Sequence, residues 1–206
     1  KYLIIQTFHW LSYRALKKKT LTWVGVPFIK FPHDLIFYQK IIFETKPDLI
    51  IETGTKHGGT TLFLAHILDL IGNGRIITIE LNSWRKLKFS HPRITQLIGS
   101  STDPEIINKI IPKGRVMVIL DSDHSKQHVI RELELYSSLV TTGCYLIIED
   151  TNIGIYDKKF WDWRDKRKLN GPLAALKEFN LIDFKPDDQI EEFYLTMSHN
   201  GYWVRI

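Results

Sequence analysis

Short runs of apolar, often β-branched residues alternate with helical patterns along most of this chain. Runs with the character of buried strands cover 48–53, 75–81, 94–98, 115–120 and 144–148. Apolar residues at spacings of three and four, which are typical of amphipathic helices, cover 33–45, 58–71, 104–111, 127–140 and 172–179. This alternation predicts an α/β fold, a Rossmann-like and mostly parallel sheet with helices on both faces.

The end of the chain departs from this alternation. Residues 193–197 and 202–206 both have the pattern of strands, and Asn200-Gly201 lies between them. Asn-Gly between two such runs is a strong signal for a hairpin. We therefore expect the sheet to finish in a C-terminal antiparallel hairpin.

The chain's 206 residues suit one α/β domain with a sizeable core. Residues 1–24, which are rich in aromatics, look like an N-terminal extension, and residues 25–206 like a single domain. The aromatics of the extension are compatible with a homo-oligomer. The stretch 152–170 lacks a periodic apolar face, so we expect an irregular segment there.

Charge and cysteine content narrow the class of protein. The formal net charge is +5, but most basic residues are dispersed and no RNA-binding module is apparent, which argues against nucleic acid as the partner. Cys144 is the single cysteine, so an intrachain disulfide and a Cys-rich zinc site are excluded. The lone thiol suits a reducing compartment, and we expect a cytoplasmic protein. No apolar run approaches the roughly 18 residues of a membrane-spanning helix.

Acidic residues follow two of the expected strands directly. Asp121 comes after the strand at 115–120, and Glu149 and Asp150 come after the strand at 144–148. Parallel strands separated by one helical crossover bring these ends to the same edge of the sheet. Three carboxylates without a thiolate favour Mg²⁺, with Mn²⁺ or Ca²⁺ as alternatives. The pattern predicts a metal site formed by Asp121, Glu149 and Asp150.

His124 lies three residues after Asp121 and is the expected general base. A hydroxyl bound to a dication becomes more acidic, and a neutral histidine beside it can take its proton. Asp123 competes with Asp121 for the ligand role, and His128 is a poorer choice of base. In the alternative interpretation, these acids cap a helix or pair with basic residues, and the histidine is an ordinary surface residue.

A glycine-containing turn joins the strand at 48–53 to the next helix. It contains Glu52, Gly54, Thr55, Gly58 and Gly59. The spacing does not fit the dinucleotide fingerprint, and a fixed negative charge at its first position would repel a pyrophosphate. An acidic first position followed by Gly-x-x-x-Gly is instead the pattern of class I S-adenosylmethionine-dependent methyltransferases. A tight turn without any ligand is the alternative.

Two later segments fit the same cofactor. Glu80 closes the second strand and can accept hydrogen bonds from both ribose hydroxyls, whereas Ser100, Ser101 and Thr102 follow the third strand and can contact the adenine. Alternatively, Glu80 is only a solvated strand end.

Several motifs together resemble the cephalosporin hydroxylase/rhamnosyl O-methyltransferase family. They are Trp23-x-Gly25-x-Pro27, Asp34-Leu35 with Tyr38-Gln39, the segment 47–54, the segment 99–104, the segment 120–125 and the segment 148–152. The family has a class I methyltransferase fold despite its hydroxylase label, and the chain is also similar to magnesium-dependent macrolide-sugar O-methyltransferases.

The resemblance implies S-adenosylmethionine and Mg²⁺ as cofactors, and the hydroxyl of a sugar-like small molecule as acceptor. It implies that Asp121, Glu149 and Asp150 hold the metal and that His124 is the base. It also implies that Glu52, Gly54 and Glu80 belong to the cofactor site, which Tyr38 and Gln39 are expected to line.

The chain departs from the family at 152–170, where it has aromatic and basic residues in place of a short Gly/Pro-rich passage. We interpret this segment as a lid or acceptor-recognition loop, since aromatic faces suit sugar rings; a packed surface insertion is the alternative. The functional hypothesis is a metal-dependent O-methyltransferase. Its rivals are a hydroxylase or dehydrogenase, and a non-catalytic cofactor-binding partner subunit.

Overall fold

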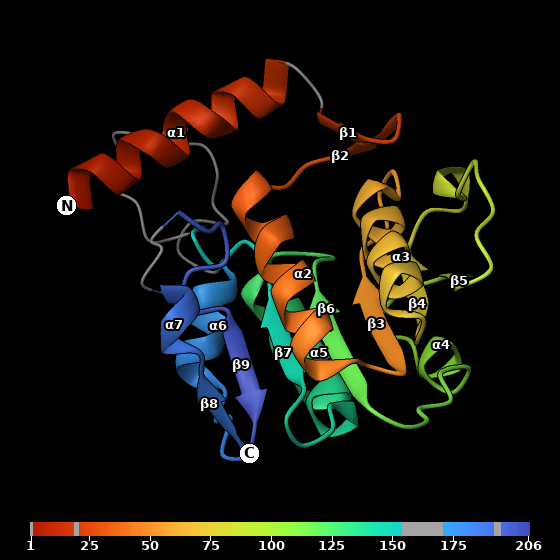
Figure 1. The fold of residues 1–206 in the computed structure, drawn as a ribbon. Coiled ribbons are helices and arrows are strands. Elements are labelled where there is room, and N and C mark those ends of the chain that lie inside the picture. The colour runs from red at the N-terminus through yellow and green to blue at the C-terminus, as the bar shows by residue number, and fades with distance from the viewer. Residues whose placement is uncertain (1, 19–20, 154–170, 192–194) are drawn as a thin grey trace.

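The computed structural model describes residues 2–18, 21–153, 171–191 and 195–206. The chain starts with helix α1 (Tyr2–Lys18), followed by an antiparallel pair of short strands, β1 (Leu21–Trp23) and β2 (Val26–Phe28). Figure 1 shows α1 and this strand pair beyond one end of the main sheet. Helix α1 and β1 therefore lie within the N-terminal extension expected at 1–24. The proposed lid at 152–170 falls almost wholly outside the described residues and stays a prediction.

The main sheet has the strand order β5-β4-β3-β6-β7-β9-β8. Its strands are β3 (Leu49–Thr53), β4 (Arg75–Glu80), β5 (Ile94–Ile98), β6 (Val116–Leu120), β7 (Tyr145–Ile148), β8 (Phe184–Pro186) and β9 (Tyr202–Arg205). The pairs from β5 to β7 are parallel, and those of β9 with β7 and β8 are antiparallel. The expected parallel strands and the antiparallel end of the sheet are confirmed.

One strand of the antiparallel end was assigned wrongly from the sequence. Strand β9 pairs with β8, not with 193–197, whose described residues 195–197 form no strand. Polar contacts hold that segment against a helix instead. The Thr196 hydroxyl donates to Asp34 Oδ1 at 2.5 Å, and the Met197 amide donates to Asp34 Oδ2 at 3.2 Å. The apolar side chain of Met197, which is buried, is therefore a sign of burial rather than of strand pairing.

Helices cover both faces of the sheet, as expected for strands that are apolar on both sides. One face packs against α2 (Pro32–Thr45), α3 (Gly59–Ile71) and α7 (Asp188–Glu191). The other packs against α4 (Pro104–Ile107), α5 (Lys126–Tyr136) and α6 (Pro172–Glu178). Successive residues of β3 alternate between the two layers: Ile50 belongs to the first core and Ile51 to the second. Figure 1 shows α2 and α3 in front of the sheet.

The order of the strands reverses at the centre of the sheet, between β3 and β6. From β3 the chain proceeds through β4 to β5 at one edge, and then returns to β6 and β7 on the opposite side of β3. The connections that leave β3 and β6 therefore diverge, and open α/β sheets bind ligands at such a switch point, outside the carboxyl ends of the strands. The two clusters predicted from the sequence follow β3 and β6–β7, so they lie at this switch point.

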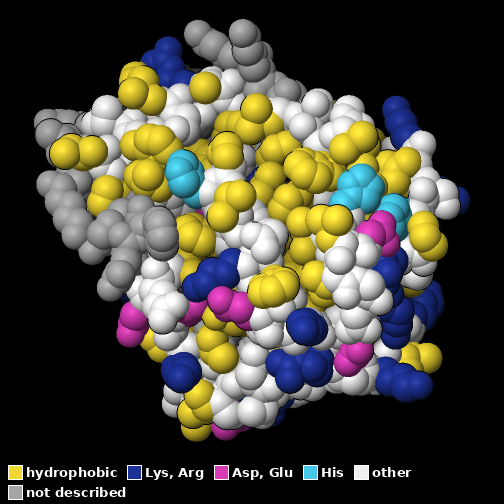
Figure 2. Space-filling model, viewed as in Figure 1, with side chains coloured by type: hydrophobic (Ala, Val, Ile, Leu, Met, Phe, Trp, Pro, Cys, Tyr) yellow, Lys and Arg dark blue, Asp and Glu magenta, His cyan; other side chains and the backbone are white. Residues whose placement is uncertain are grey.

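The surface also shows where apolar side chains are gathered. On the face shown in Figure 2, hydrophobic side chains are concentrated in the half of the molecule that carries α1, β1 and β2. Exposed examples on these elements and their connections include Ile4, Leu11, Val24 and Ile29. Self-association through the N-terminal aromatics stays a prediction. Among the described helices, none combines the length and the apolar character that a bilayer crossing requires.

Candidate functional site

Glu52 lies near the carboxyl end of β3 and is almost completely buried, with 2% of its surface exposed. Its Oε2 accepts hydrogen bonds from the Thr61 hydroxyl at 2.5 Å and from the Thr78 hydroxyl at 2.7 Å. Burial raises the pKa of Glu52 to about 7, although these two hydrogen bonds act in the opposite direction. The sequence therefore places a carboxyl group with a neutral-range pKa beside the predicted cofactor turn.

The turn after β3 depends on glycine at positions where it approaches other backbone. Gly54 has φ +89°, and a Cβ built there would lie 2.0 Å from the carbonyl oxygen of Asp121. Gly59, which begins α3, would place a Cβ 2.4 Å from the carbonyl oxygen of Pro27. Gly58 caps the helix at φ +83°, and the hydroxyl of Thr55 shares a 2.7 Å hydrogen bond with that of Thr78. The close approach of Gly54 to the Asp121 carbonyl shows that the turn is in direct contact with the Asp121 segment.

Glu80 closes β4 and is also buried. Its Oε2 accepts from the Lys56 amide at 2.8 Å and its Oε1 from the Asn82 amide at 3.0 Å. The carboxylate is thus held between the turn after β3 and the turn after β4. The expected role of Glu80 at the ribose of the cofactor stays a prediction.

Four other residues expected at the cofactor site differ in their burial and in their contacts. Ser101 is buried and its hydroxyl lies 3.0 Å from His128 Nε2, whereas Ser100 is half-buried. Tyr38 is fully buried on α2, and its hydroxyl has no hydrogen-bond partner among the described residues. Gln39, next to it, is exposed. The cofactor roles of these four residues stay predictions.

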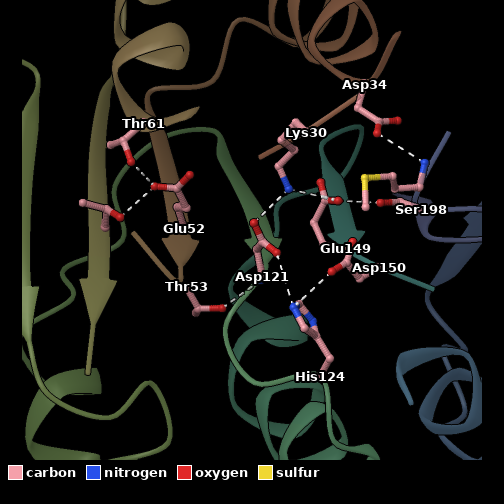
Figure 3. Close-up of polar contacts among 12 residues, drawn as sticks. Lys30, Asp34, Glu52, Thr53, Thr61, Asp121, His124, Glu149, Asp150 and Ser198 are labelled. Atoms are coloured by element: carbon pink, nitrogen blue, oxygen red, sulfur yellow. Dashed lines mark hydrogen bonds and ion pairs between the residues drawn. The ribbon is translucent and has the colours of Figure 1, made fainter. Parts of the chain in front are cut away.

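The second cluster lies after β6 and β7. Asp121, His124 and Asp150 offer ligand atoms that all lie within 4.8 Å of one another. His124 Nε2 is 3.2 Å from Asp150 Oδ2 and 4.0 Å from Asp121 Oδ1, as Figure 3 shows. Burial raises the pKa of Asp150, while the nearby His124 lowers it. The structure therefore brings together the predicted base and two of the three predicted metal ligands.

Glu149, the third predicted ligand, is oriented toward a different partner. Its Oε2 lies 3.0 Å from Lys30 Nζ and accepts from the Ser198 hydroxyl at 2.5 Å. Lys30 Nζ also donates to Asp121 Oδ2 at 2.8 Å, so the lysine bridges the ends of β6 and β7 (Figure 3). The other oxygen of Glu149, Oε1, is buried and has no hydrogen-bond partner within the described parts of the chain. The ligand role of Glu149 stays a prediction.

The residues that competed for these roles lie outside the cluster. Asp123 is exposed, and its Oδ1 accepts from the Ser125 amide at 2.7 Å. His128 Nε2 lies 3.0 Å from the hydroxyl of Ser122 and 3.5 Å from Glu132 Oε1. The hydrogen bond with Glu132 raises the pKa of His128. The position of Asp121 thus favours it over Asp123 as a ligand.

Lys30, Ser198 and Asp34 belong to the site but were not identified from the sequence. Asp34 is fully buried, and burial together with the nearby Glu149 raises its pKa to about 7. A signal for Lys30 was available, because it stands alone between Ile29 and Phe31, and a lysine in an apolar run needs a buried counter-charge. Ser198 carries no such signal.

The donor set suits a hard divalent cation. Its atoms are carboxylate oxygens and one imidazole nitrogen, without a thiolate, which is compatible with Mg²⁺ or Mn²⁺. Oε1 of Glu149, which has no hydrogen-bond partner among the residues that the structure describes, is a further buried oxygen at this end of the sheet. The residues present therefore fit the metal implied by the sequence pattern.

Comparison with known proteins places the chain in a family. A sequence model of the family described as rhamnosyl O-methyltransferase/CmcI matches residues 16–206. The chain belongs to this family. Among curated members, the rhamnosyl O-methyltransferase of Mycobacterium tuberculosis (strain ATCC 25618 / H37Rv) is 35% identical, over 98% of this chain and 85% of the relative. That of Mycobacterium leprae (strain TN) is 30% identical, over 98% of this chain and 90% of the relative.

Solved structures show the same fold for this rhamnosyl O-methyltransferase/CmcI family member. A structure of CmcI described with Mg and SAM superimposes with a TM-score of 0.68 at 18% identity, covering 90% of this chain and 76% of CmcI. A putative caffeoyl-CoA O-methyltransferase from Staphylococcus aureus gives a TM-score of 0.64 at 14% identity, covering 88% and 86% of the two chains. The fold predicted from the sequence, that of a class I methyltransferase, is confirmed.

Proposed function

We propose that this chain is an S-adenosylmethionine-dependent O-methyltransferase that requires Mg²⁺ or Mn²⁺ and methylates a hydroxyl of a sugar or glycoside. One observation carries the proposal: the cluster of Asp121, His124 and Asp150 lies against the turn after β3, with Gly54 in contact with the Asp121 backbone. A methyl donor and a hydroxyl acceptor would therefore meet at one point. Family membership supports this assignment, and the names of the mycobacterial relatives support a sugar acceptor.

The acidic residues and the histidine at this edge of the sheet have different roles in the proposed reaction. Glu52 and Glu80 present carboxylates for the ammonium and ribose groups of S-adenosylmethionine, whose sulfonium supplies the methyl group. A divalent ion held by Asp121 and Asp150 would lower the pKa of a hydroxyl that it contacts. His124, held between two carboxylates at 3.2 and 4.0 Å, accepts the proton of the acceptor hydroxyl. Holding the two reacting centres aligned accounts for much of the expected rate enhancement.

Methyl transfer should depend on a divalent ion. Incubation of the protein with isotopically labelled S-adenosylmethionine and a panel of rhamnosides and other glycosides should give products that carry the labelled methyl group by mass spectrometry. Excess EDTA should stop the reaction, and Mg²⁺ or Mn²⁺ should restore it. A full rate in EDTA would contradict the metal requirement. Purification with bound NADH or iron, without affinity for S-adenosylhomocysteine, would favour the hydroxylase hypothesis instead.

His124 is close enough to the acids to serve as base or as metal ligand, and a substitution separates the two roles. If it is the base, His124→Ala should reduce kcat by about 100- to 1,000-fold while the Mn²⁺ affinity, measured by isothermal titration calorimetry, stays near that of the wild type. His91→Ala, at a half-buried histidine that pairs with Asp69 at 3.0 Å just before β5, is the matched control and should leave both unchanged. Loss of Mn²⁺ binding in His124→Ala would make His124 a ligand and refute its role as base.

A further inference from the structure

Lys30 lies on the connection between β2 and α2, and only 3% of its surface is exposed. Its ammonium contacts Asp121 Oδ2 at 2.8 Å and Glu149 Oε2 at 3.0 Å. The aromatic ring of Tyr38 lies nearby, with its centroid 5.9 Å from Nζ. Figure 3 shows the ammonium between the acids that end β6 and β7. The lysine is thus a buried internal cation at the predicted metal site.

The charges around Lys30 explain how an ammonium is tolerated there. Burial alone would lower the pKa of Lys30, but Asp121, Glu149 and Asp150 together raise it well above its ordinary value. Without Lys30, two carboxylates at neighbouring strand ends would face each other across a buried space. Such groups are stable inside a protein only when a cation pairs with them.

An ion bound by Asp121 and Glu149 would need the space that Lys30 fills. Magnesium binds oxygens at about 2.0–2.1 Å, so a metal that bridges the oxygens now 2.8 and 3.0 Å from Nζ would lie within repulsive range of the ammonium. Glu149 is also kept in its present orientation by the hydroxyl of Ser198. By contrast, Asp121 also offers a ligand atom within 4.8 Å of those of His124 and Asp150, and a cation held by these atoms does not need Lys30 to leave Glu149.

We propose that Lys30 is a built-in counter-cation that holds Asp121 and Glu149 in the metal-free protein and competes with the divalent ion for these two carboxylates. Asp121 and Asp150 receive the ion first, and Glu149 completes the ligand set only when Lys30 releases it. Lys30 is therefore a positioning residue that sets the metal affinity of the site. This inference rests on the proposed function, since it assumes that the site takes a divalent ion.

Direct titration of the metal tests the competition. Lys30→Met removes the ammonium and keeps an apolar stem of similar length, so its Kd for Mn²⁺ and for Mg²⁺, measured calorimetrically without substrate, should fall at least about tenfold. Lys40→Met, the same substitution at a more exposed position of α2, should leave both constants unchanged. Equal or weaker metal binding by Lys30→Met would overturn the proposal, as would failure of both proteins to bind metal.

A second measurement avoids reliance on a variant that buries uncompensated acids. In wild-type protein labelled with ¹⁵N at lysine Nζ, the Lys30 ammonium resonance is identified by its absence from Lys30→Arg, which keeps the charge. Addition of Mg²⁺ should shift or broaden this resonance as Lys30 leaves Glu149. Saturation with Mg²⁺ without any change would overturn the proposal.

The two proposals can fail separately. Affinity for S-adenosylhomocysteine and transfer of a labelled methyl group are measured on the same preparations. If both are retained although neither protein binds metal, the inference about Lys30 and the metal requirement are refuted, while the assignment of S-adenosylmethionine-dependent methyl transfer stands. If the metal constants differ as expected but no methyl is transferred to any glycoside, the competition is supported and the assigned reaction is contradicted.

Discussion

Asp121→Asn should reduce methyl transfer by about 1,000-fold while the Kd for S-adenosylhomocysteine changes by less than about threefold. Asp121 serves both sides of the cluster: its Oδ2 accepts from Lys30, and its Oδ1 faces His124. An asparagine keeps the shape but removes the negative charge that attracts a divalent ion. The cofactor turn should be largely unaffected, because Gly54 contacts the backbone carbonyl of residue 121 rather than its side chain.

Asp123→Asn is the matched control, since the same chemical change is made two residues away. Asp123 is exposed and its described contact is with the Ser125 amide, so methyl transfer should stay near the wild-type rate. Steady-state rates with saturating Mg²⁺ and cofactor, together with calorimetric titration of S-adenosylhomocysteine, provide the comparison. A large loss in Asp123→Asn with normal Asp121→Asn turnover would transfer the ligand role to Asp123.

The regular part of the fold was predictable because each strand carries its own signal. A run such as 115–120 is apolar throughout, since β6 is buried on both faces, and its limits in the structure are Val116–Leu120. The strand that pairs with β9 was not predictable in the same way. Strand β8 has a single buried residue, Phe184, and ends in Lys185-Pro186, so its pattern is too short to detect. The segment 193–197 imitated a strand in its sequence pattern, but its described residues Thr196 and Met197 are buried without strand pairing and donate hydrogen bonds to Asp34.

The residues of the candidate site were predictable where they directly follow recognisable strands. They were not predictable where the fold brings distant segments of the chain together. Asp121, His124 and Asp150 follow strands that the sequence shows, so topology alone makes them neighbours. The partners of Glu149 come from much earlier and much later in the chain: Lys30 precedes the sheet, and Ser198 follows it. No short-range pattern encodes such a contact. The result is that a predicted metal ligand is engaged by a lysine that the sequence did not associate with it.

Glu52→Gln should stabilise the cofactor-free protein at pH 8 and weaken its binding of cofactor. In the folded protein the pKa of Glu52 is about 7, against an ordinary value of 4.5. Between these two values the unfolded chain has released its proton while the folded chain still holds it, so the free energy of unfolding falls as pH rises. The difference amounts to about 3 kcal/mol once both states are ionised. Glutamine cannot ionise, so the variant does not incur this loss.

Urea denaturation of both proteins at a series of pH values measures the effect. The variant and the wild type should be equally stable near pH 4, where Glu52 is protonated in both states, and the variant should gain its full advantage above pH 7. Glu105→Gln, the same substitution at an exposed residue of α4, is the control and should not reproduce this gain in stability.

The same substitution should weaken S-adenosylhomocysteine binding about tenfold or more, because a hydrogen bond to a charged group contributes about 1.5–3 kcal/mol. If Glu52→Gln is more stable than the wild type and binds S-adenosylhomocysteine more weakly, the Glu52 carboxylate destabilises the free protein and is needed for binding the cofactor. A variant that is less stable than the wild type at pH 8 would show that Glu52 is a structural residue of β3. If Glu52→Gln binds S-adenosylhomocysteine as tightly as the wild type, Glu52 does not bind the ammonium group of the cofactor.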